Sequence, residues 1–246
     1  MSMSSAVPGT PVALVTGAAG GLGRAAVAKL RERGMRVFAV DRALAEIQCG
    51  APVGVMSVDV TDEAAIGVCI ERVLTEWGRL DHVVHLAGCA GVGPLTSVTR
   101  DEWQRILDTN LTSAFLLAKA SYEALAATRG SLVLTASTNG LNGGSSLSGP
   151  AYAVAKAGLI NLTRYLAKEW APAGIRVNCL APGPIDTPMV TGRFSSEVLT
   201  NLRASVPLGR IGDPKDVAHA IDYLTSPAAS FVTGTVMNLS GGLVLD

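Results

Sequence analysis

Short apolar runs alternate with longer segments of helical periodicity along nearly the whole chain of 246 residues. The runs are rich in β-branched residues and almost continuously apolar, which is typical of parallel strands covered by helices on both faces. Regular alternation of strand and helix predicts βαβ units. The sequence therefore predicts an α/β fold with a doubly wound parallel sheet of about seven strands.

The expected strands are Val12–Thr16, Val37–Val40, Val53–Val58, Val83–Leu86, Ser131–Thr135, Arg176–Cys179 and Val236–Leu239. The expected helices are Gly21–Arg33, Asp62–Trp77, Asp101–Thr128, Ala151–Trp170, Ser195–Ala204 and Pro214–Thr225. No linker or repeat interrupts this pattern, so we expect one domain over residues 11–246 after a short tail at residues 1–10. Two Gly-, Ser- and Pro-rich segments, Asn139–Gly149 and Pro182–Phe194, are expected as loops at the carboxyl edge of the sheet.

Charge and composition exclude several classes of partner. The chain has 20 basic and 20 acidic residues and only 4% aromatic residues, so it lacks the surface that binds nucleic acid or an anionic membrane. Charged residues break its most apolar stretch, Ala114–Ala136, so we expect no membrane span. The four cysteines form no C-x-x-C pair and Met1–Pro8 does not resemble a signal peptide. We therefore expect a cytoplasmic protein without a metal site that acts on a small molecule.

A glycine-rich turn follows the first expected strand. Gly17, Gly21 and Gly23 allow the backbone to turn sharply and approach a pyrophosphate at the start of the next helix. A glycine-rich turn without a ligand is the alternative, because such a motif alone is weak. Asp41 favours the ligand, since it ends the second strand where a carboxylate binds the ribose hydroxyls of a dinucleotide.

The identity of the dinucleotide depends on two neighbouring charges. The carboxylate of Asp41 would repel a 2′-phosphate, which favours NAD over NADP. Arg42 is the complication, because an arginine at this point can bind a phosphate. Asp59 is a candidate for the adenine amino group or an acid near the start of a helix.

Tyr152 and Lys156 lie four residues apart, on one face of an expected helix. Lowering a tyrosine pKa from about 10 to about 7 costs roughly 4 kcal/mol. One ammonium at about 4 Å supplies about that much when the effective dielectric constant is near 20. The pair is therefore a candidate proton acceptor, with Ser137 and Asn110 as candidate polar partners. The other interpretations are a snorkelling lysine, a turn serine and a buried asparagine at a helix kink.

Taken together, these motifs resemble the short-chain dehydrogenase/reductase family from Thr16 to about Gly242. The T-G-x-x-x-G-x-G motif of the family corresponds to Thr16, Gly17, Gly21 and Gly23. Its Y-x-x-x-K motif, serine and asparagine correspond to Tyr152, Lys156, Ser137 and Asn110. Its P-G-x-x-x-T stretch corresponds to Pro182, Gly183 and Thr187, with Ile185 between them.

The resemblance implies a Rossmann-like fold and direct hydride transfer between a nicotinamide and a secondary alcohol or ketone. It implies that Tyr152 exchanges the substrate proton, Ser137 positions the substrate oxygen and Lys156 binds the nicotinamide ribose. Asn110 would organise a water relay. The implied cofactor site also includes Leu22, Val60, Ala87 and Gly88, and the implied assembly is a homotetramer built on the helices Asp101–Thr128 and Ala151–Trp170. Ala118, Leu159 and Leu166 are the outward positions that we expect at its interfaces.

Two features depart from the family pattern. His85 and Leu86 stand where the family usually has two asparagines. We interpret His85 as a structural residue whose ring nitrogens need partners at the strand end, although a titrating histidine there could make cofactor binding pH-dependent. The separation of Ser137 and Tyr152 is two residues longer than usual, so Ser145, Ser146 and Ser148 are lesser candidates for the catalytic serine.

The leading interpretation is an NAD(H)-dependent dehydrogenase or reductase of a secondary alcohol or ketone. An NADPH-dependent reductase of 3-oxoacyl thioesters is the enzymatic alternative, and a non-catalytic dinucleotide-binding protein is the other. The substrate is expected to be selected by residues 139–149 and by a lid over residues 189–201. In these segments only Arg193 suggests contact with an anion.

Overall fold

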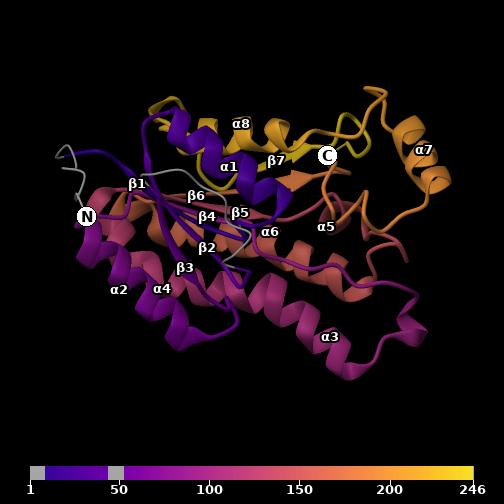
Figure 1. Cartoon of the computed structure of the whole chain (residues 1–246), viewed down its shortest axis with the longest axis horizontal. Helices are drawn as coiled ribbons and strands as arrows, with labels where there is room; N and C mark the ends of the chain where they lie inside the picture. Colours follow the sequence, from indigo (N-terminus) through magenta and orange to yellow (C-terminus); the bar gives the residue numbers. More distant parts are fainter. Residues whose placement is uncertain (1–8, 44–52, 246) are drawn as a thin grey trace.

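A sheet of seven parallel strands forms the centre of the molecule (Figure 1). The computed structural model describes residues 9–43 and 53–245, so most of the expected tail lies outside the described residues. The strand order is β3-β2-β1-β4-β5-β6-β7. The chain starts at β1, builds outward to β3, and then returns beside β1 to build the other half from β4. This is the doubly wound, Rossmann-like single-domain α/β fold that the sequence predicts.

The strands differ little from expectation. They are β1 (Val12–Thr16), β2 (Arg36–Asp41), β3 (Val53–Ser57), β4 (His82–His85), β5 (Ser131–Thr135), β6 (Arg176–Pro182) and β7 (Val236–Leu239). The largest difference is at β6, which continues beyond the expected end at Cys179 because β7 pairs with residues 179–182.

The two faces of the sheet are covered by different helices. Successive strand residues point to opposite faces, so Leu14 packs with α2 (Glu63–Trp77), α4 (Ser113–Thr128) and α6 (Pro150–Trp170), whereas Val15 packs with α1 (Gly21–Glu32) and α8 (Pro214–Leu224). The remaining helices are α3 (Arg100–Leu107), α5 (Asn139–Asn142) and α7 (Ser196–Ser205), with 3₁₀ turns at Leu95–Ser97, Ala171–Ala173 and Pro227–Ala229. The sheet is therefore buried between two helical layers.

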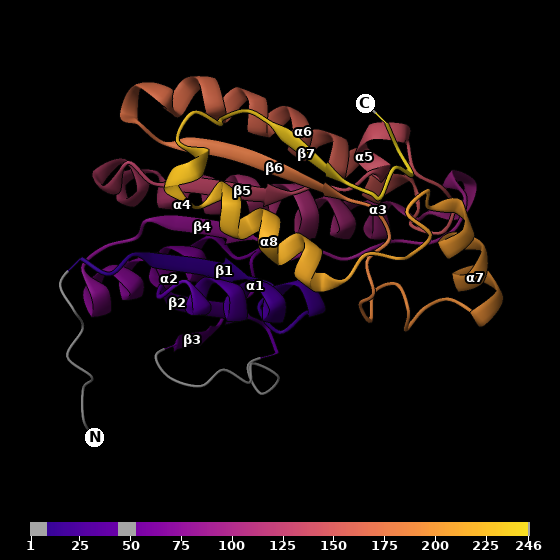
Figure 2. The same ribbon diagram turned by 90° about the horizontal axis from the view of Figure 1, so that it is seen from above.

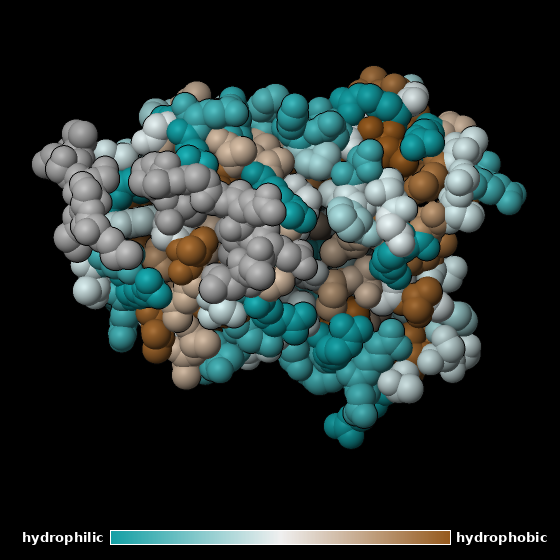
Figure 3. Space-filling view, in the orientation of Figure 1, coloured by the Kyte–Doolittle hydropathy of each residue, from teal (hydrophilic) through white to brown (hydrophobic). Residues whose placement is uncertain are grey.

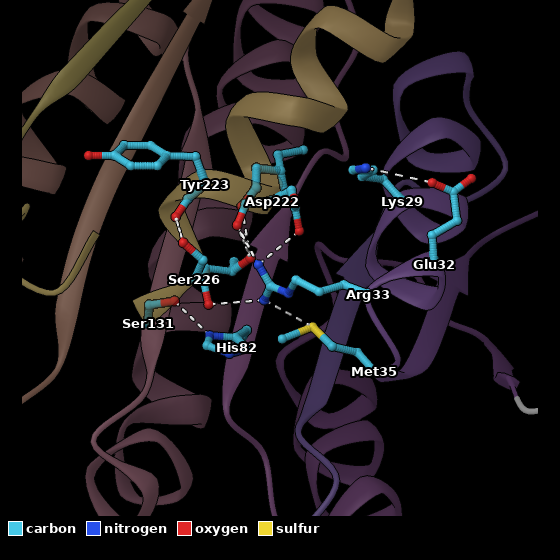
Figure 4. Close-up of polar contacts among 11 residues, drawn as sticks. Lys29, Glu32, Arg33, Met35, His82, Ser131, Asp222, Tyr223 and Ser226 are labelled. Atoms are coloured by element: carbon cyan, nitrogen blue, oxygen red, sulfur yellow. Dashed lines mark hydrogen bonds and ion pairs between the residues drawn. The ribbon is translucent and has the colours of Figure 1, made fainter. Parts of the chain in front are cut away.

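Helices α1 and α8 lie side by side on one face (Figure 2). Arg33, directly after α1, joins them (Figure 4). Its guanidinium donates to the Asp222 carboxylate at 2.9 Å and to the Thr225 carbonyl oxygen at 3.0 Å. The last carbonyl groups of a helix lack helical partners and attract cations. Arg33 thus fixes the end of α8 at the amino edge of the sheet.

The single helix that we expected over Asp101–Thr128 is divided. A turn of π-helix, Asp108–Thr112, separates α3 from α4. The side chains of Asn110 and Thr109 donate to the carbonyl oxygens of Ile106 and Arg105, both at 2.9 Å. These bonds satisfy backbone acceptors where the α-helical ladder is interrupted. The interruption turns Asn110 inward, where it is fully buried.

The expected outward positions on α4 and α6 were wrong. Ala118, Leu159 and Leu166 are all buried in the core, because the helices present these positions to the sheet. The exposed large apolar residues of these two helices are Phe115, Val154 and Tyr165.

Of the two expected loops, Asn139–Gly149 contains the short helix α5, whereas Pro182–Phe194 continues from β6 as bends and turns. Helix α7 lies close to the helix expected over Ser195–Ala204 and begins within the expected lid, where Ser195 Oγ caps it by accepting from Val198 N. Cys69 and Cys179 are buried and Cys89 is partly exposed, all three as free thiols, whereas Cys49 lies outside the described residues. Within residues 9–43 and 53–245, no helix is long and apolar enough to span a bilayer.

Candidate functional site

The turn between β1 and α1 packs closely against the end of β4. Gly17 has a φ of +68°, and a Cβ atom there would lie 2.6 Å from the backbone nitrogen of Ala87. A Cβ atom on Gly23 would overlap the carbonyl oxygen of Gly17. Gly20, the N-cap residue of α1, supplies no side-chain cap. The first N–H groups of α1 therefore keep the capacity to bind a phosphate.

A cavity of about 400 Å³ lies over the carboxyl ends of β1, β2 and β4. It lies where the strand order reverses, which is where doubly wound sheets bind their ligands. The expected cofactor residues that line it are Gly17, Gly21, Leu22, Gly23, Asp41, Asp59, Val60, Ala87, Gly88 and Thr187. Met189 lines it as well.

Asp41 and its neighbours line the part of this cavity at the end of β2. The Asp41 carboxylate accepts hydrogen bonds from the backbone N–H groups of Ala19 and Ala43, both at 3.1 Å. Arg42, which is 75% exposed, lies 3.6 Å from the Asp59 carboxylate. Hydrogen bonds from Thr61 hold the pKa of Asp59 below its usual range. Helix α2 is capped by Asp62 instead, which leaves Asp59 beside the cavity.

The remaining expected cofactor residues at β6 have different surroundings. The carbonyl oxygen of Pro182 accepts a hydrogen bond from Thr138 N at 3.0 Å, and Gly183 lines a second cavity of about 170 Å³. Ile185 is 4% exposed and its side chain packs in the core with α1 and α8. The side chain of Ile185 therefore does not line either cavity.

Ser137 and Tyr152 meet at the second cavity, which both residues line. The Ser137 hydroxyl is close enough to the Tyr152 hydroxyl to lower the pKa of Tyr152. Of the alternative serines, Ser145 and Ser148 also line this cavity and Ser146 does not, but only Ser137 influences the pKa of Tyr152. Ser137 is therefore the serine that the structure brings to Tyr152.

Tyr152 and Lys156 share one face of α6, as expected, but their charges interact differently from our prediction. The buried Lys156 Nζ donates to the Thr135 carbonyl oxygen at 2.6 Å and lies 5.4 Å from the centroid of the Tyr152 ring. Burial raises the pKa of Tyr152 above its ordinary value, against the hydrogen bond from Ser137 and the charge of Arg193. The expected lowering of the Tyr152 pKa by Lys156 is therefore wrong for the arrangement seen here. Burial also lowers the pKa of Lys156 to about 8.

The Asn110 side chain joins the π-helical turn to the segment after β4. Its Nδ2 donates to the carbonyl oxygens of Ile106 and Cys89, at 2.9 and 2.8 Å. Its Oδ1 is buried and, among the described residues, has no partner. A Cβ atom on Gly88 would lie 2.7 Å from this oxygen. Because buried polar atoms are almost always hydrogen-bonded, Oδ1 points to a donor supplied by a water or a ligand.

These observations test whether a nicotinamide dinucleotide fits the site. The close glycine turn and the uncapped start of α1 fit a pyrophosphate. The Asp41 carboxylate fits ribose hydroxyls, and the unpartnered Asn110 Oδ1 fits a further donor. The residues present therefore fit the cofactor.

His85 forms a buried network between strand ends and the π-helical turn. Its Nδ1 lies 2.8 Å from Thr16 Oγ1 and its Nε2 lies 3.0 Å from Ser113 Oγ. Burial, with a contribution from the Lys156 charge, lowers the pKa of His85 to about 3. His85 therefore stays neutral near neutrality, in agreement with its interpretation as a structural residue and not with the alternative of a titrating one.

Two partners in the site could not be found from the motifs. The Thr135 carbonyl oxygen holds Lys156, and any residue type at that position would offer the same acceptor. Ser113, at the start of α4, contacts His85, and no sequence motif indicates that a helix begins there. The only signal was the presence of a histidine at a strand end, which requires polar partners when buried.

Comparison with known proteins identifies similar sequences over almost the full length. A family model described as enoyl-(acyl carrier protein) reductase matches residues 17–244. The 3-oxoacyl-[acyl-carrier-protein] reductase of Vibrio cholerae is 36% identical over 240 residues, covering 95% of this chain and 97% of that protein. The same-named enzyme of Escherichia coli has the same identity and coverage. The cis-4-hydroxycyclohexanecarboxylate dehydrogenase of Sinomonas cyclohexanicum is 39% identical over 240 residues, covering 94% of this chain and 95% of that protein.

The buried histidines predict how stability depends on pH. Burial lowers the folded-state pKa of His85 to about 3 and that of His82 to about 4, from 6.5. The unfolded chain therefore binds protons that the folded chain does not, and stability falls as the pH drops below about 6.5. Each histidine adds a slope of up to about 1.4 kcal/mol per pH unit.

We expect His85→Asn to reduce the slope of unfolding free energy between about pH 6.5 and 5 by about half. Urea denaturation at a series of pH values measures this slope. The matched control is His219→Asn on the exposed face of α8, which should keep the slope of the unmodified protein. An unchanged slope in His85→Asn would contradict the buried, neutral assignment.

Proposed function

We propose that this chain, which belongs to the short-chain dehydrogenase/reductase family, reduces the 3-oxo group of an acyl thioester to a 3-hydroxy group. Membership of the family makes it an NAD(P)-dependent oxidoreductase that acts on CH–OH or C=O groups. The reductases of Vibrio cholerae and Escherichia coli support the thioester substrate. The observation that carries the reaction is the meeting of Ser137 and Tyr152 at the smaller cavity.

The raised pKa of Tyr152 supports the direction of reduction. A phenol that holds its proton near neutrality is ready to donate it when a carbonyl oxygen becomes an alkoxide. The Ser137 hydroxyl is placed to donate a second hydrogen bond to the same oxygen, which polarises the carbonyl group. Both hydroxyls therefore act on one substrate oxygen.

Bound nicotinamide dinucleotide supplies the hydride chemistry. In our proposal the glycine turn and the start of α1 hold its pyrophosphate, Asp41 its adenosine ribose, and Lys156 its other ribose. The end of β6, from Pro182 to Thr187, lines the nicotinamide side with Gly183 and the backbone of Ile185.

Lys156 and Asn110 would return a proton to Tyr152. The Lys156 ammonium has a pKa near 8 and is held by the Thr135 carbonyl oxygen, so it can gain and lose a proton near neutrality. The unpartnered Asn110 Oδ1 supplies the acceptor that would hold a water on this path. We propose this relay for the chain.

The mouth of the smaller cavity suits an acyl chain. Leu147 and Met189 line it and are 41% and 40% exposed. Figure 3 shows hydrophobic residues gathered at the end of the molecule that carries α7. Apolar side chains on a surface commonly mark a binding site for an apolar group.

NADH is the cofactor that we propose. The Asp41 carboxylate lines the larger cavity and would repel a 2′-phosphate. Arg42 opposes this preference, but its ion pair with Asp59 already gives its guanidinium a partner.

A second candidate function is the NAD-dependent oxidation of a secondary alcohol, the leading interpretation from sequence. The Asp41 carboxylate favours NAD, and the dehydrogenase of Sinomonas cyclohexanicum supports a hydroxylated ring acid as the substrate.

We also propose a cytoplasmic homotetramer, with Phe115, Val154 and Tyr165 at its interfaces.

The substrate test uses acetoacetyl-N-acetylcysteamine with NADH or NADPH, and cyclohexanol or 4-hydroxycyclohexanecarboxylate with NAD or NADP. We expect absorbance at 340 nm to fall fastest with the thioester and NADH. Faster oxidation of the ring alcohols would favour the second candidate. No turnover with any pair would indicate a non-catalytic dinucleotide-binding protein.

Replacing the proton donor should remove the chemistry and keep the cofactor. We expect Tyr152→Phe to lower kcat/KM by about 10²- to 10⁴-fold, as for loss of a general acid. The matched control is Tyr122→Phe, whose ring packs on Trp170 away from both cavities. Steady-state kinetics measure the loss, and NADH fluorescence checks that cofactor binding remains. Full activity of Tyr152→Phe would contradict the mechanism.

The cofactor preference is tested by removing one charge. Asp41→Asn keeps the shape of the side chain and an oxygen that can accept from Ala19 N, but it no longer repels a phosphate. We expect the ratio of kcat/KM for NADPH to that for NADH to rise by about tenfold or more, as for about 1.4 kcal/mol. Arg42→Gln should lower activity with NADPH only. An unchanged ratio in Asp41→Asn would remove Asp41 from the choice of cofactor.

A further inference from the structure

Arg193 is held at the mouth of the smaller cavity by neighbouring segments. Turns between β6 and α7 fold the chain back, and Arg193 N donates to the Val190 carbonyl oxygen at 3.2 Å. Its Nη2 donates across the mouth to the Gly91 carbonyl oxygen at 2.9 Å. The guanidinium carbon lies 5.8 Å from the centroid of the Phe194 ring. Although Arg193 is an exposed residue, its guanidinium therefore has a defined position.

This guanidinium is the only charged group among the described residues that line the smaller cavity. The other lining groups are apolar or neutral and include Ser137 and Tyr152, where the reacting oxygen would lie. In the part of the chain that the structure describes, the Gly91 carbonyl oxygen is the only hydrogen-bond partner of the Arg193 guanidinium, and no carboxylate forms an ion pair with it. Its Nε and Nη1 donors remain for another acceptor.

The charge of Arg193 also acts on the reacting groups. It is one of the influences that lower the pKa of Tyr152 against the effect of burial. The guanidinium and the Tyr152 hydroxyl thus belong to one electrostatic environment. A substrate oxygen close to the reacting carbon would lie within the same field.

We propose that Arg193 determines substrate specificity by binding an oxygen of a carboxyl-level group, either a carboxylate or a thioester carbonyl, close to the reacting carbon. Guanidinium groups form strong hydrogen bonds with such oxygens, and the other residues that line the cavity carry no competing charge. The enzyme therefore selects oxo compounds that carry a second, acyl oxygen over plain ketones. This assignment rests on the proposed function and adds the feature by which its substrate is recognised.

The test compares three substrates that share a reacting methyl ketone. Acetoacetyl-N-acetylcysteamine carries a thioester, acetoacetate carries a carboxylate, and pentan-2-one carries neither. The variants are Arg193→Gln, Arg193→Lys and, as a matched control, Arg203→Gln on the exposed face of α7 away from the cavity lining. Steady-state kinetics give kcat and KM for each pair.

We expect Arg193→Gln to lower kcat/KM by about 10- to 100-fold for at least one acyl substrate, mainly through KM, as for loss of a hydrogen bond to a charged group. The value for pentan-2-one should change by less than about threefold. Arg193→Lys should restore part of the loss, and Arg203→Gln should show none. A loss with acetoacetate identifies a carboxylate as the partner, and a loss with the thioester identifies its carbonyl oxygen.

An equal loss for all three substrates, or no loss, would overturn the proposal, because Arg193 would then only hold the segment against Gly91. Calorimetry supplies a second readout that needs no turnover. Acetoacetate or the thioester is titrated into the protein with NAD or NADP, with which an oxo compound cannot react. We expect about tenfold weaker binding to Arg193→Gln, and equal binding would refute the role. A wild-type enzyme that binds acetoacetate but reduces none of the substrates would refute the proposed function alone.

Discussion

The contact on which the rest of the site depends is the approach of Gly17 to the backbone of Leu86 and Ala87. It occurs between β1 and β4, the two central strands, where the connections leave in opposite directions. No side chain fits between the two segments. The turn after β1 can therefore direct the start of α1 toward a ligand, while the residues after β4 form the opposite wall. The glycines are needed for this spacing even before any ligand is considered.

Burial governs the protonation of the polar groups around this contact. Lys156, His85 and Tyr152 all have pKa values moved toward the neutral form. For His85 the result is a fixed neutral group that ties Thr16 to Ser113. For Tyr152 the result is a phenol that retains its proton, which suits reduction. The same physical cause thus gives a structural role to one residue and a chemical role to the other.

The sequence was sufficient for the sheet and for most residues around the cavities, because these features depend on local patterns. Strand ends carry Gly17, Asp41 and Ser137 to one edge, and parallel pairing alone then brings them together. The break at Asn110 was not predictable, since it depends on side-chain bonds to Ile106 and Arg105 within an otherwise helical pattern.

The predictions of the outward positions on α4 and of the pKa of Tyr152 were wrong for a related reason. Both depend on which neighbours from distant parts of the chain cover a side chain. Ala118 is covered by the sheet. Around Tyr152, burial raises the pKa by more than the positive charge of Arg193 lowers it.

Met189 forms part of the wall of both cavities. A ligand that fixes this side chain from one cavity reduces the conformational entropy that remains to be lost when the other cavity fills. Where such coupling occurs, thermodynamic linkage makes it equal in both directions. A side chain shared by two walls is thus a physical route by which occupation of one cavity can change the affinity of the other.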